Sequence, residues 1–268
     1  MFENLAKVPA KIINSTKVVC LAPPSYVLRQ SIVEITLNNQ QYTDDNNVFY
    51  YYRPPYLFDI NPREGPVTGG TRVIAIGSNF RDTGNITCKF NETMVPGKYL
   101  STSEIECYSP TNERTGFVPL SVSLELDMYS QPVQYLYYER PIIYDIYPKC
   151  GPDYGYTQIT VIGKNFLDMG HNKALCVFNK TIFTNATIME SDVIKCDSPS
   201  LINSQGYSMM QNDLIWYNLE ITIDGGREIN GPAQNFTYYK DPRINDIVPS
   251  MGPVKGGTLT SILGKGFN

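Results

Sequence analysis

Six cysteines are the most reactive side chains of this sequence, and zinc binding is the first chemistry to consider for them. Zinc sites usually draw on C-x-x-C pairs, often together with histidines. The chain has no C-x-x-C pair and only one histidine, His171. This spacing disfavours zinc and leaves disulfide bonds or buried free thiols as the alternatives. We therefore expect neither a metal site nor a cofactor.

Acidic side chains offer no clear catalytic pair. Asp44 and Asp45 are adjacent, and Asp224 lies near Glu228, but both pairs fall in polar, turn-like segments. Solvated turns explain them, and the DMGHNK context makes His171 a surface histidine. Serine nucleophile elbows and phosphate-binding loops are absent from the sequence. We expect no catalytic residues and no enzyme; an enzyme, or an accessory module of one, is the alternative.

Sequons of the form N-x-S/T are the second group of residues with a defined chemistry, because the secretory pathway attaches glycans to them. The chain has six, of which two flank Cys88 and two follow Cys176. Together with the cysteines they favour a secreted or cell-surface protein, since disulfides also persist there. We expect N-linked glycans on exposed strands or loops at Asn14, Asn85, Asn91, Asn179, Asn185 and Asn235.

The elements that position these residues are repeated along the chain. The phrase INPREGPVTGGTRVIAIGSNF at Ile60–Phe80 returns in related form at Ile146–Phe166 and Ile247–Phe267, with spacings of 86 and 101 residues. A second phrase, KVVCLAPP, recurs in related form with its cysteine at Cys20, Cys107 and Cys196, which are 87 and 89 residues apart. Repeats this long are whole domains rather than solenoid units.

Each copy of the first phrase ends in a turn signal. The residue before the final phenylalanine is Asn or Gly, which tolerate positive φ, so we expect a left-handed turn there and a buried phenylalanine after it. The turn residues are Asn79, Asn165 and Gly266, and the phenylalanines are Phe80, Phe166 and Phe267. The Gly69–Gly70 pair recurs as Gly256–Gly257 but is Gly155–Tyr156 in the middle copy. We expect a different bend there, because positive φ is costly for tyrosine.

Strand signals dominate the remaining sequence. Segments such as Phe117–Leu126 alternate apolar and polar residues, and Gly, Pro, Asn and Asp clusters interrupt such segments at intervals of roughly 8–12 residues, as in a β-sandwich. No stretch has helical apolar spacing with caps. The poorly patterned stretch Leu201–Asp213 predicts an enlarged loop, which accounts for the longer second spacing.

The order P-x-x-G-P-x-x-G-G-T, an alternating strand, G-x-N-F, C-x-F and I-x-C-x-S-P resembles the IPT/TIG domain, the immunoglobulin-like module of plexins, scatter-factor receptors and fibrocystin-like proteins. The resemblance covers essentially the whole chain and implies an all-β fold of tandem immunoglobulin-like β-sandwiches. In this family a disulfide often joins the C-x-F cysteine to the C-x-S-P cysteine. That pairing implies Cys88 with Cys107 and Cys176 with Cys196, at nearly equal separations of 19 and 20 residues.

The repeats predict two complete domains, residues 53–139 and 140–240, and two partial ones. Residues 1–52 resemble the C-terminal part of a domain, and residues 241–268 resemble the N-terminal part of one. Linkers of about two or three residues, each containing proline, predict a semi-rigid rod.

The two partial domains leave two explanations open: the chain is a window of a longer array, or it is the repeat of a periodic assembly in which one copy's end meets the next copy's start. Aligning Cys20 with Cys107 places Met1 opposite Cys88, so the expected partner of Cys20 falls at or before the first residue. Cys150 has no counterpart in the other copies, and its role stays open.

Composition narrows the possible partners. The net charge is −4 without a basic cluster, which speaks against nucleic acid even though transcription factors also use this sandwich. No apolar run approaches the ~18 residues of a membrane span, and the first residues lack the apolar stretch of a signal peptide, so we expect any signal upstream. The 20 tyrosines suit sandwich strands and domain joints, with an exposed ligand platform as the alternative.

These features predict a non-catalytic structural or adhesive extracellular rod, which spaces a binding module from a surface or forms a surface coat or filament. The alternative is the stalk of a plexin-like or fibrocystin-like cell-surface receptor, with a head upstream and a transmembrane helix downstream. Expected partners are other copies of the chain or adjacent domains of the same large protein. Because fold alone does not give function, the specific partner is not predicted.

Overall fold

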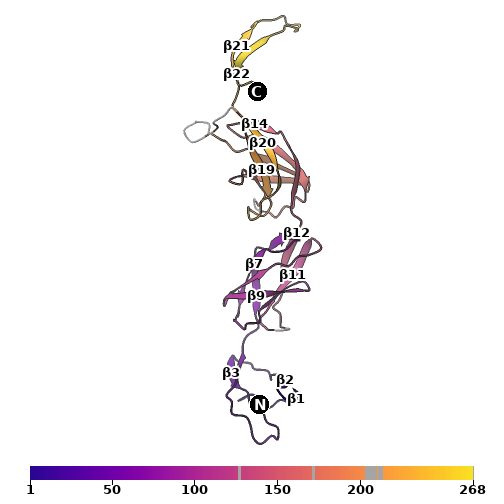
Figure 1. Ribbon diagram of the computed structural model, residues 1–268, viewed down its shortest axis with the longest axis vertical. Helices are drawn as coiled ribbons and strands as arrows, with labels where there is room; N and C mark the ends of the chain where they lie inside the picture. The colour runs from indigo at the N-terminus through magenta and orange to yellow at the C-terminus, as the bar shows by residue number, and fades with distance from the viewer. Residues whose placement is uncertain (126–127, 171–172, 203–209, 211–213, 268) are drawn as a thin grey trace. The chain divides into compact units, whose positions relative to one another are not determined.

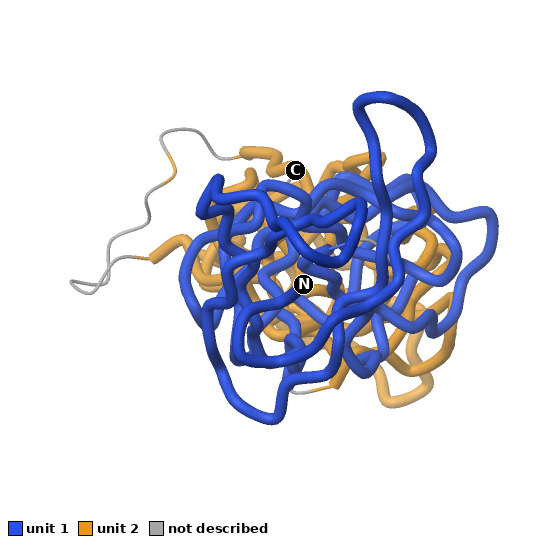
Figure 2. The backbone as a smooth tube through the Cα atoms, turned by 90° about the horizontal axis from the view of Figure 1, so that it is seen from below, with its two compact units in different colours: residues 1–137 blue, residues 138–268 orange. Residues whose placement is uncertain are grey.

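The chain divides into two compact units, residues 1–137 and 138–268 (Figure 2). The computed structural model describes residues 1–125, 128–170, 173–202, 210 and 214–267. All helices and strands assigned within these residues are β-strands, with no helix among them. The strands form two eight-stranded arrangements and three two-stranded hairpins. The prediction of an all-β fold of tandem immunoglobulin-like sandwiches is therefore confirmed.

The first unit begins with two hairpins. One hairpin pairs β1 (Ala10–Asn14) with β2 (Lys17–Cys20), and the other pairs β3 (Arg29–Ile32) with β4 (Val48–Tyr51). Most side chains of β1 and β2 are exposed. Phe2 is buried and makes an edge-to-face contact with Phe49 of β4, at 5.5 Å between ring centroids.

The first sandwich follows in the same unit (Figure 1). One sheet has the strand order β5-β7-β10-β9 and the other β9-β8-β11-β12-β6, so β9 belongs to both sheets. Gly97 lies where β9 passes from one sheet to the other, and a Cβ atom there would lie only 2.6 Å from Ile86 Cγ2. The strands are β5 (Tyr56–Asn61), β6 (Glu64–Pro66), β7 (Arg72–Ser78), β8 (Thr87–Phe90), β9 (Thr93–Ser101), β10 (Glu104–Tyr108), β11 (Gly116–Ser123) and β12 (Val133–Tyr138).

The repeated G-x-N-F element closes this sandwich as predicted. Asn79 has a φ of 62°, and Phe80 after it is 2% exposed. A Cβ atom at Gly77 would collide with the backbone oxygen of Tyr56 and with the Phe80 ring. The glycine is thus required because β5 and the phenylalanine both approach the backbone of β7 closely at this point.

Alternating apolar residues from both sheets form the core of the first sandwich. The inward side chains of β11, Leu120 and Val122, are completely buried, and so is Leu124 after the strand. Tyr135 and Tyr137 of β12 are also buried in this cluster and contact each other edge-to-face. Two of the many tyrosines therefore contribute to the core, as the sandwich interpretation predicts.

The second sandwich repeats this topology in the second unit. Its sheets have the orders β13-β15-β18-β17 and β17-β16-β19-β20-β14, and β17 is the shared strand. Asn165 has a φ of 62° and Phe166 is 3% exposed, so the second left-handed turn is also confirmed. The strands are β13 (Ile142–Tyr147), β14 (Cys150–Pro152), β15 (Gln158–Lys164), β16 (Leu175–Phe178), β17 (Ile182–Glu190), β18 (Val193–Asp197), β19 (Leu214–Thr222) and β20 (Asn230–Tyr239).

The expectation of a different bend at Gly155–Tyr156 is wrong. Tyr156 has a φ of 59°, in the same left-handed region as Gly70 with 82°. The Tyr156 N–H donates to the Ser198 carbonyl at 2.9 Å, and the Gly70 N–H makes the equivalent bond to Ser109. This tertiary hydrogen bond fixes the backbone in spite of the steric cost of a tyrosine Cβ, and the ring points into solvent with 80% exposure.

The last hairpin corrects a second expectation. It pairs β21 (Arg243–Val248) with β22 (Ser261–Lys265), and Gly266 after it has the expected positive φ of 83°. Phe267, however, is 56% exposed rather than buried. The turn depends on local backbone preference, whereas burial of the phenylalanine needs the strands that cover Phe80 and Phe166 in the two sandwiches.

Most of the expected enlarged loop, residues 203–209 and 211–213 within Leu201–Asp213, lies outside the described residues. Leu201 and Met210 are described, and both are buried in the core of the second sandwich.

Candidate functional site

The structure contains the two disulfide bonds that the family resemblance implied. Cys88 is joined to Cys107 and Cys176 to Cys196, with Cα atoms 6.3 and 6.4 Å apart. Each bond links the two sheets of one sandwich, since it connects strands on either side of the shared strand: β8 to β10, and β16 to β18. All four cysteines are buried. By restricting the unfolded chain, a cross-link closing a loop of this length contributes about 3 kcal/mol to the free energy of unfolding.

The other two cysteines carry free, exposed thiols. Cys20 ends β2, and Cys150 begins β14. Cys150 lies opposite Thr237, where β14 and β20 pair in parallel. The equivalent residue of the first sandwich is Glu64, the first residue of β6.

All six sequon asparagines lie on exposed positions. Asn14 ends β1, where its side-chain oxygen accepts hydrogen bonds from the N–H and the hydroxyl of Thr16. In the first sandwich, Asn85 precedes β8, and Asn91 follows β8 with a φ of 53°. The sequons of this sandwich therefore flank the strand that carries Cys88.

The three sequons of the second sandwich lie on one sheet. Asn179 follows β16, Asn185 lies in β17 opposite Leu175 of β16, and Asn235 lies in β20 opposite Asn218 of β19. Asn179 and Asn218 are also neighbours, because the Asn218 N–H donates to the Asn179 side-chain oxygen at 3.0 Å. Asn235, Asn218 and Asn179 thus form a row across β20, β19 and the end of β16.

Sequons are confined to the same sheet in both sandwiches. In the first they flank β8, and in the second they lie on or beside β16, β17 and β20. The sheets β5-β7-β10 and β13-β15-β18 contain no sequon within the described residues. Their outer faces carry exposed aromatic side chains, including Phe58 with 57% and Tyr144 with 56% exposure.

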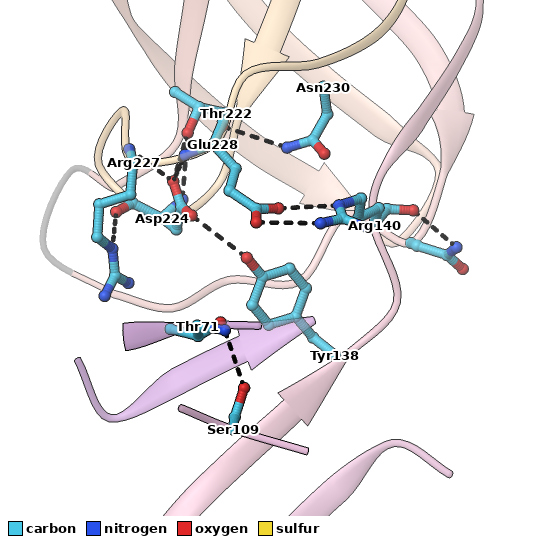
Figure 3. Close-up of polar contacts among 10 residues, drawn as sticks. Thr71, Ser109, Tyr138, Arg140, Thr222, Asp224, Arg227, Glu228 and Asn230 are labelled. Atoms are coloured by element: carbon cyan, nitrogen blue, oxygen red, sulfur yellow. Dashed lines mark hydrogen bonds and ion pairs between the residues drawn. The ribbon is translucent and has the colours of Figure 1, made fainter. Parts of the chain in front are cut away.

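A buried acidic cluster replaces the solvated turn that we expected at Asp224 (Figure 3). Asp224 is only 5% exposed and follows β19. One carboxylate oxygen accepts hydrogen bonds from the Thr222 hydroxyl at 2.7 Å and from the N–H groups of Arg227 and Glu228 at 3.0 and 3.1 Å. The other accepts a hydrogen bond from the Tyr138 hydroxyl at 3.2 Å. The expectation of a solvated turn at Asp224 is wrong, because residues of the same turn donate hydrogen bonds to its carboxylate and bury it.

Tyr138 is a hydrogen-bond donor in this cluster over the whole ordinary pH range. Its side chain is 2% exposed, and burial raises the pKa of its phenol far above its usual value. The negative charge of Asp224 raises the pKa of Tyr138 further. Asp224 is therefore held by donors from its own turn and from the residue that precedes the linker into the second sandwich.

Glu228 contributes a second contact to the same linker. Arg140 Nε donates to Glu228 Oε2 at 2.9 Å and Arg140 Nη2 donates to Oε1 at 3.1 Å, a bidentate ion pair (Figure 3). Both side chains are partly exposed. The two acids considered as a possible catalytic pair thus bind residues 138–140 to the loop between β19 and β20.

A related arrangement occurs in the first sandwich. Leu120 and Leu219 occupy equivalent positions, opposite Phe90 of β8 and Phe178 of β16, so the acid five residues later is Glu125 in one copy and Asp224 in the other. Burial, and secondarily the charge of Glu125, raise the pKa of Tyr52, which occupies the position of Tyr138. A tyrosine near an acid is therefore a repeated feature, which the tyrosines at the domain openings could have suggested.

The remaining candidate residues lie apart from this cluster. Asp44 and Asp45 are exposed in the loop between β3 and β4, as expected. His171 lies outside the described residues. In the part of the chain that the structure describes, no group of three or more His, Cys, Asp and Glu side chains is placed to hold a metal ion. The same part contains no helix long and apolar enough to cross a membrane.

The family model for the IPT/TIG domain matches residues 55–137 and 141–238, which together make up more than half of the chain. The matched ranges coincide closely with the two sandwiches, from β5 to β12 and from β13 to β20. This chain belongs to the IPT/TIG domain family, with two tandem copies of the domain.

Plexins are among its relatives. The chain is 27% identical to mouse plexin-B2 over 226 residues and 25% identical to human plexin-A3 over 219 residues, covering 80% and 78% of this chain. It spans 11% of the length of either relative. A solved structure of the full extracellular region of plexin A4 matches 97% of this chain and 23% of that chain, with 22% identity and a TM-score of 0.47.

Proposed function

We propose that this chain is a non-catalytic, structural segment of an extracellular or cell-surface protein. The observation that carries the proposal is the disulfide bond within each of the two tandem sandwiches. Disulfides persist in oxidising compartments and are rare in the cytosol. Membership of the IPT/TIG family and the similarity to plexins support the same location and favour a stalk of a plexin-like protein.

The contacts of the two candidate acids, Asp224 and Glu228, support the proposal that the chain is not catalytic. Asp224 accepts four hydrogen bonds, and Glu228 forms a bidentate ion pair with Arg140. These contacts engage both carboxylates in holding a linker and a turn. A general acid or base needs a carboxyl group within reach of a substrate, and these two are already occupied by the protein.

We further propose that the six sequon asparagines carry N-linked glycans. Their exposure supports this assignment, and all six sequons end in threonine. Glycans on one sheet of each sandwich would leave the outer faces of the β5-β7-β10 and β13-β15-β18 sheets as the protein surface open to partners. The net charge of −4 supports partners other than nucleic acid.

Adjacent domains of the same protein, or other copies of the chain, are the partners that we propose. Exposed apolar side chains on β21 and β22, among them Ile247 at 43% and Ile262 at 53%, support this. Their equivalents in the first sandwich, Ile60 and Ala75, are buried. A surface coat or a filament is the finer form of this proposal, and it requires self-association of the chain in solution.

To test the proposal, the chain is fused to an N-terminal signal peptide and secreted from animal cells. Its peptides are then mapped by mass spectrometry, with and without reduction. We expect both disulfides and occupied sequons. Reduced cysteines and bare asparagines in native material would refute the extracellular assignment. Sedimentation of the same material tests self-association, and a monomer at all concentrations would remove the coat and filament proposals.

A further inference from the structure

The outer face of the β19–β20 pair carries the one tryptophan of the sequence. Trp216 is 61% exposed, whereas its strand neighbours Ile215 and Tyr217 are partly buried against the core. Since side chains alternate along a strand, Trp216 and Asn218 point to the outer face together. Leu214, two residues earlier on the same face, is 48% exposed, so the two side chains form an exposed apolar pair there.

The register places this tryptophan beside a sequon. β19 and β20 lie side by side (Figure 1), with Trp216 opposite Thr237 and Asn218 opposite Asn235. Thr237 is the threonine of the Asn235 sequon. On β20, Phe236 and Tyr238 are buried, so Asn235 and Thr237 share the outer face with Trp216.

Asn235 is therefore the diagonal cross-strand neighbour of Trp216. Diagonal neighbours on one face of an antiparallel pair lie roughly 7–8 Å apart, within reach of aromatic and long side chains. A glycan on Asn235 extends from this same face, and its first sugar is an N-acetylglucosamine. One face of that pyranose ring is lined by C–H groups, which suit the negatively polarised face of an indole.

We propose that Trp216 is a glycan-stacking residue, covered by the first N-acetylglucosamine of the N-linked glycan on Asn235. This inference rests on the proposed glycosylation of the chain and adds a specific protein–sugar contact to it. The contact shields an aromatic face from water and holds the glycan on the outer face of the β19–β20 pair. The neighbouring acceptor, Asn179, lies beyond Asn218 on the same sheet, so sugar would cover a continuous part of this surface.

The fluorescence of Trp216 measures the proposed contact directly, because the chain has no other tryptophan. The secreted chain is prepared with high-mannose glycans, and quenching of its emission by acrylamide is recorded. An endoglycosidase then trims each glycan to one N-acetylglucosamine, and an amidase removes the glycans completely from a second sample. One of two indole faces would be covered, so we expect quenching about twofold weaker in the intact and trimmed samples than in the fully deglycosylated one.

In the Asn235→Gln variant, acrylamide should quench Trp216 as strongly as in the deglycosylated chain. Asn85→Gln is the matched control, which should quench like the intact chain because its sequon lies in the first sandwich. A second readout is thermal unfolding. Asn235→Gln should lower the midpoint of the second sandwich by about 2–4 °C when Trp216 is present and leave it unchanged in a Trp216→Thr background.

Mass spectrometry of the same sample separates the possible failures. Equal quenching with and without sugar, at an occupied Asn235, overturns the stacking contact and leaves the glycosylation proposal standing. A bare Asn235 overturns the stacking contact together with the glycan assignment at this site. Weaker quenching that is lost on trimming to one sugar would also refute the proposal, because the contact would then belong to outer sugars.

Discussion

Asp224→Ala is the substitution that most directly tests the buried acidic cluster. The carboxylate accepts hydrogen bonds from two hydroxyl groups, those of Tyr138 and Thr222, and from two backbone N–H groups of the following turn. Alanine removes all four acceptor contacts at once. Since Tyr138 and Thr222 are 2% and 0% exposed, water cannot easily replace the carboxylate at either hydroxyl.

The expected loss in the free energy of unfolding comes mainly from the two buried hydroxyl groups, which lose their acceptor. A buried polar group left without a partner costs about 1–3 kcal/mol, while the turn N–H groups lie nearer the surface and can be hydrated. We therefore expect Asp224→Ala to lower the free energy of unfolding by about 3 kcal/mol. Asp224→Asn keeps the shape and one acceptor oxygen, so its cost should be about 1 kcal/mol.

Urea unfolding followed by Trp216 fluorescence is the appropriate assay, because this tryptophan reports on the second sandwich alone. Asp44→Ala, at an exposed acid, is the control and should stay within about 0.5 kcal/mol of the wild type. Tyr138→Phe should cost about 1 kcal/mol in the wild type, whereas in the Asp224→Ala background it should restore about 1 kcal/mol, because it removes a buried hydroxyl that no longer has an acceptor. If Asp224→Ala behaves like the control, the cluster does not stabilise the sandwich.

Three further predictions concern the core and its cross-links. Replacing Cys176 and Cys196 together by alanine should lower the free energy of unfolding of the second sandwich by about 3 kcal/mol in the same assay, and a loss below about 1 kcal/mol would contradict the loop-closure estimate. Gly77→Ala should destabilise the first sandwich by more than about 2 kcal/mol in calorimetry, because its Cβ would collide with the backbone of β5; an unchanged transition would show that the strand can move aside. Burial raises the pKa values of Tyr137 and Tyr238 above the ordinary value of about 10, so the folded state favours their neutral phenols. The contribution of these two neutral phenols to stability should be constant below that pH and should be lost as the pH rises above it. Phenolate absorbance of these residues should appear together with unfolding, and their titration in the folded state near pH 10 would refute the assignment.

Local sequence patterns predicted the left-handed turns before the repeated phenylalanines, but not the bend at Tyr156 or the exposure of Phe267. The position after Asn79 could be assigned because asparagine tolerates positive φ and the next residue is a large apolar one. The same logic failed for Tyr156, which adopts the angle of a glycine because Ser198 accepts its N–H from across the sandwich. It failed for Phe267 for the opposite reason: the local turn forms, but burial requires strands from elsewhere in a sandwich.

The sequence by itself determined the family, the two β-sandwiches and the positions of the sequons, because each depends on residues within a short phrase or on a phrase that recurs. The cysteine pairs followed from family resemblance, and their Cα distances agree with it. Only the tertiary structure decided that Tyr138 meets Asp224, 86 residues away, and that Trp216 lies opposite Thr237. Strand register and long-range hydrogen bonds are set by the packing of whole sheets, so no local pattern encodes them.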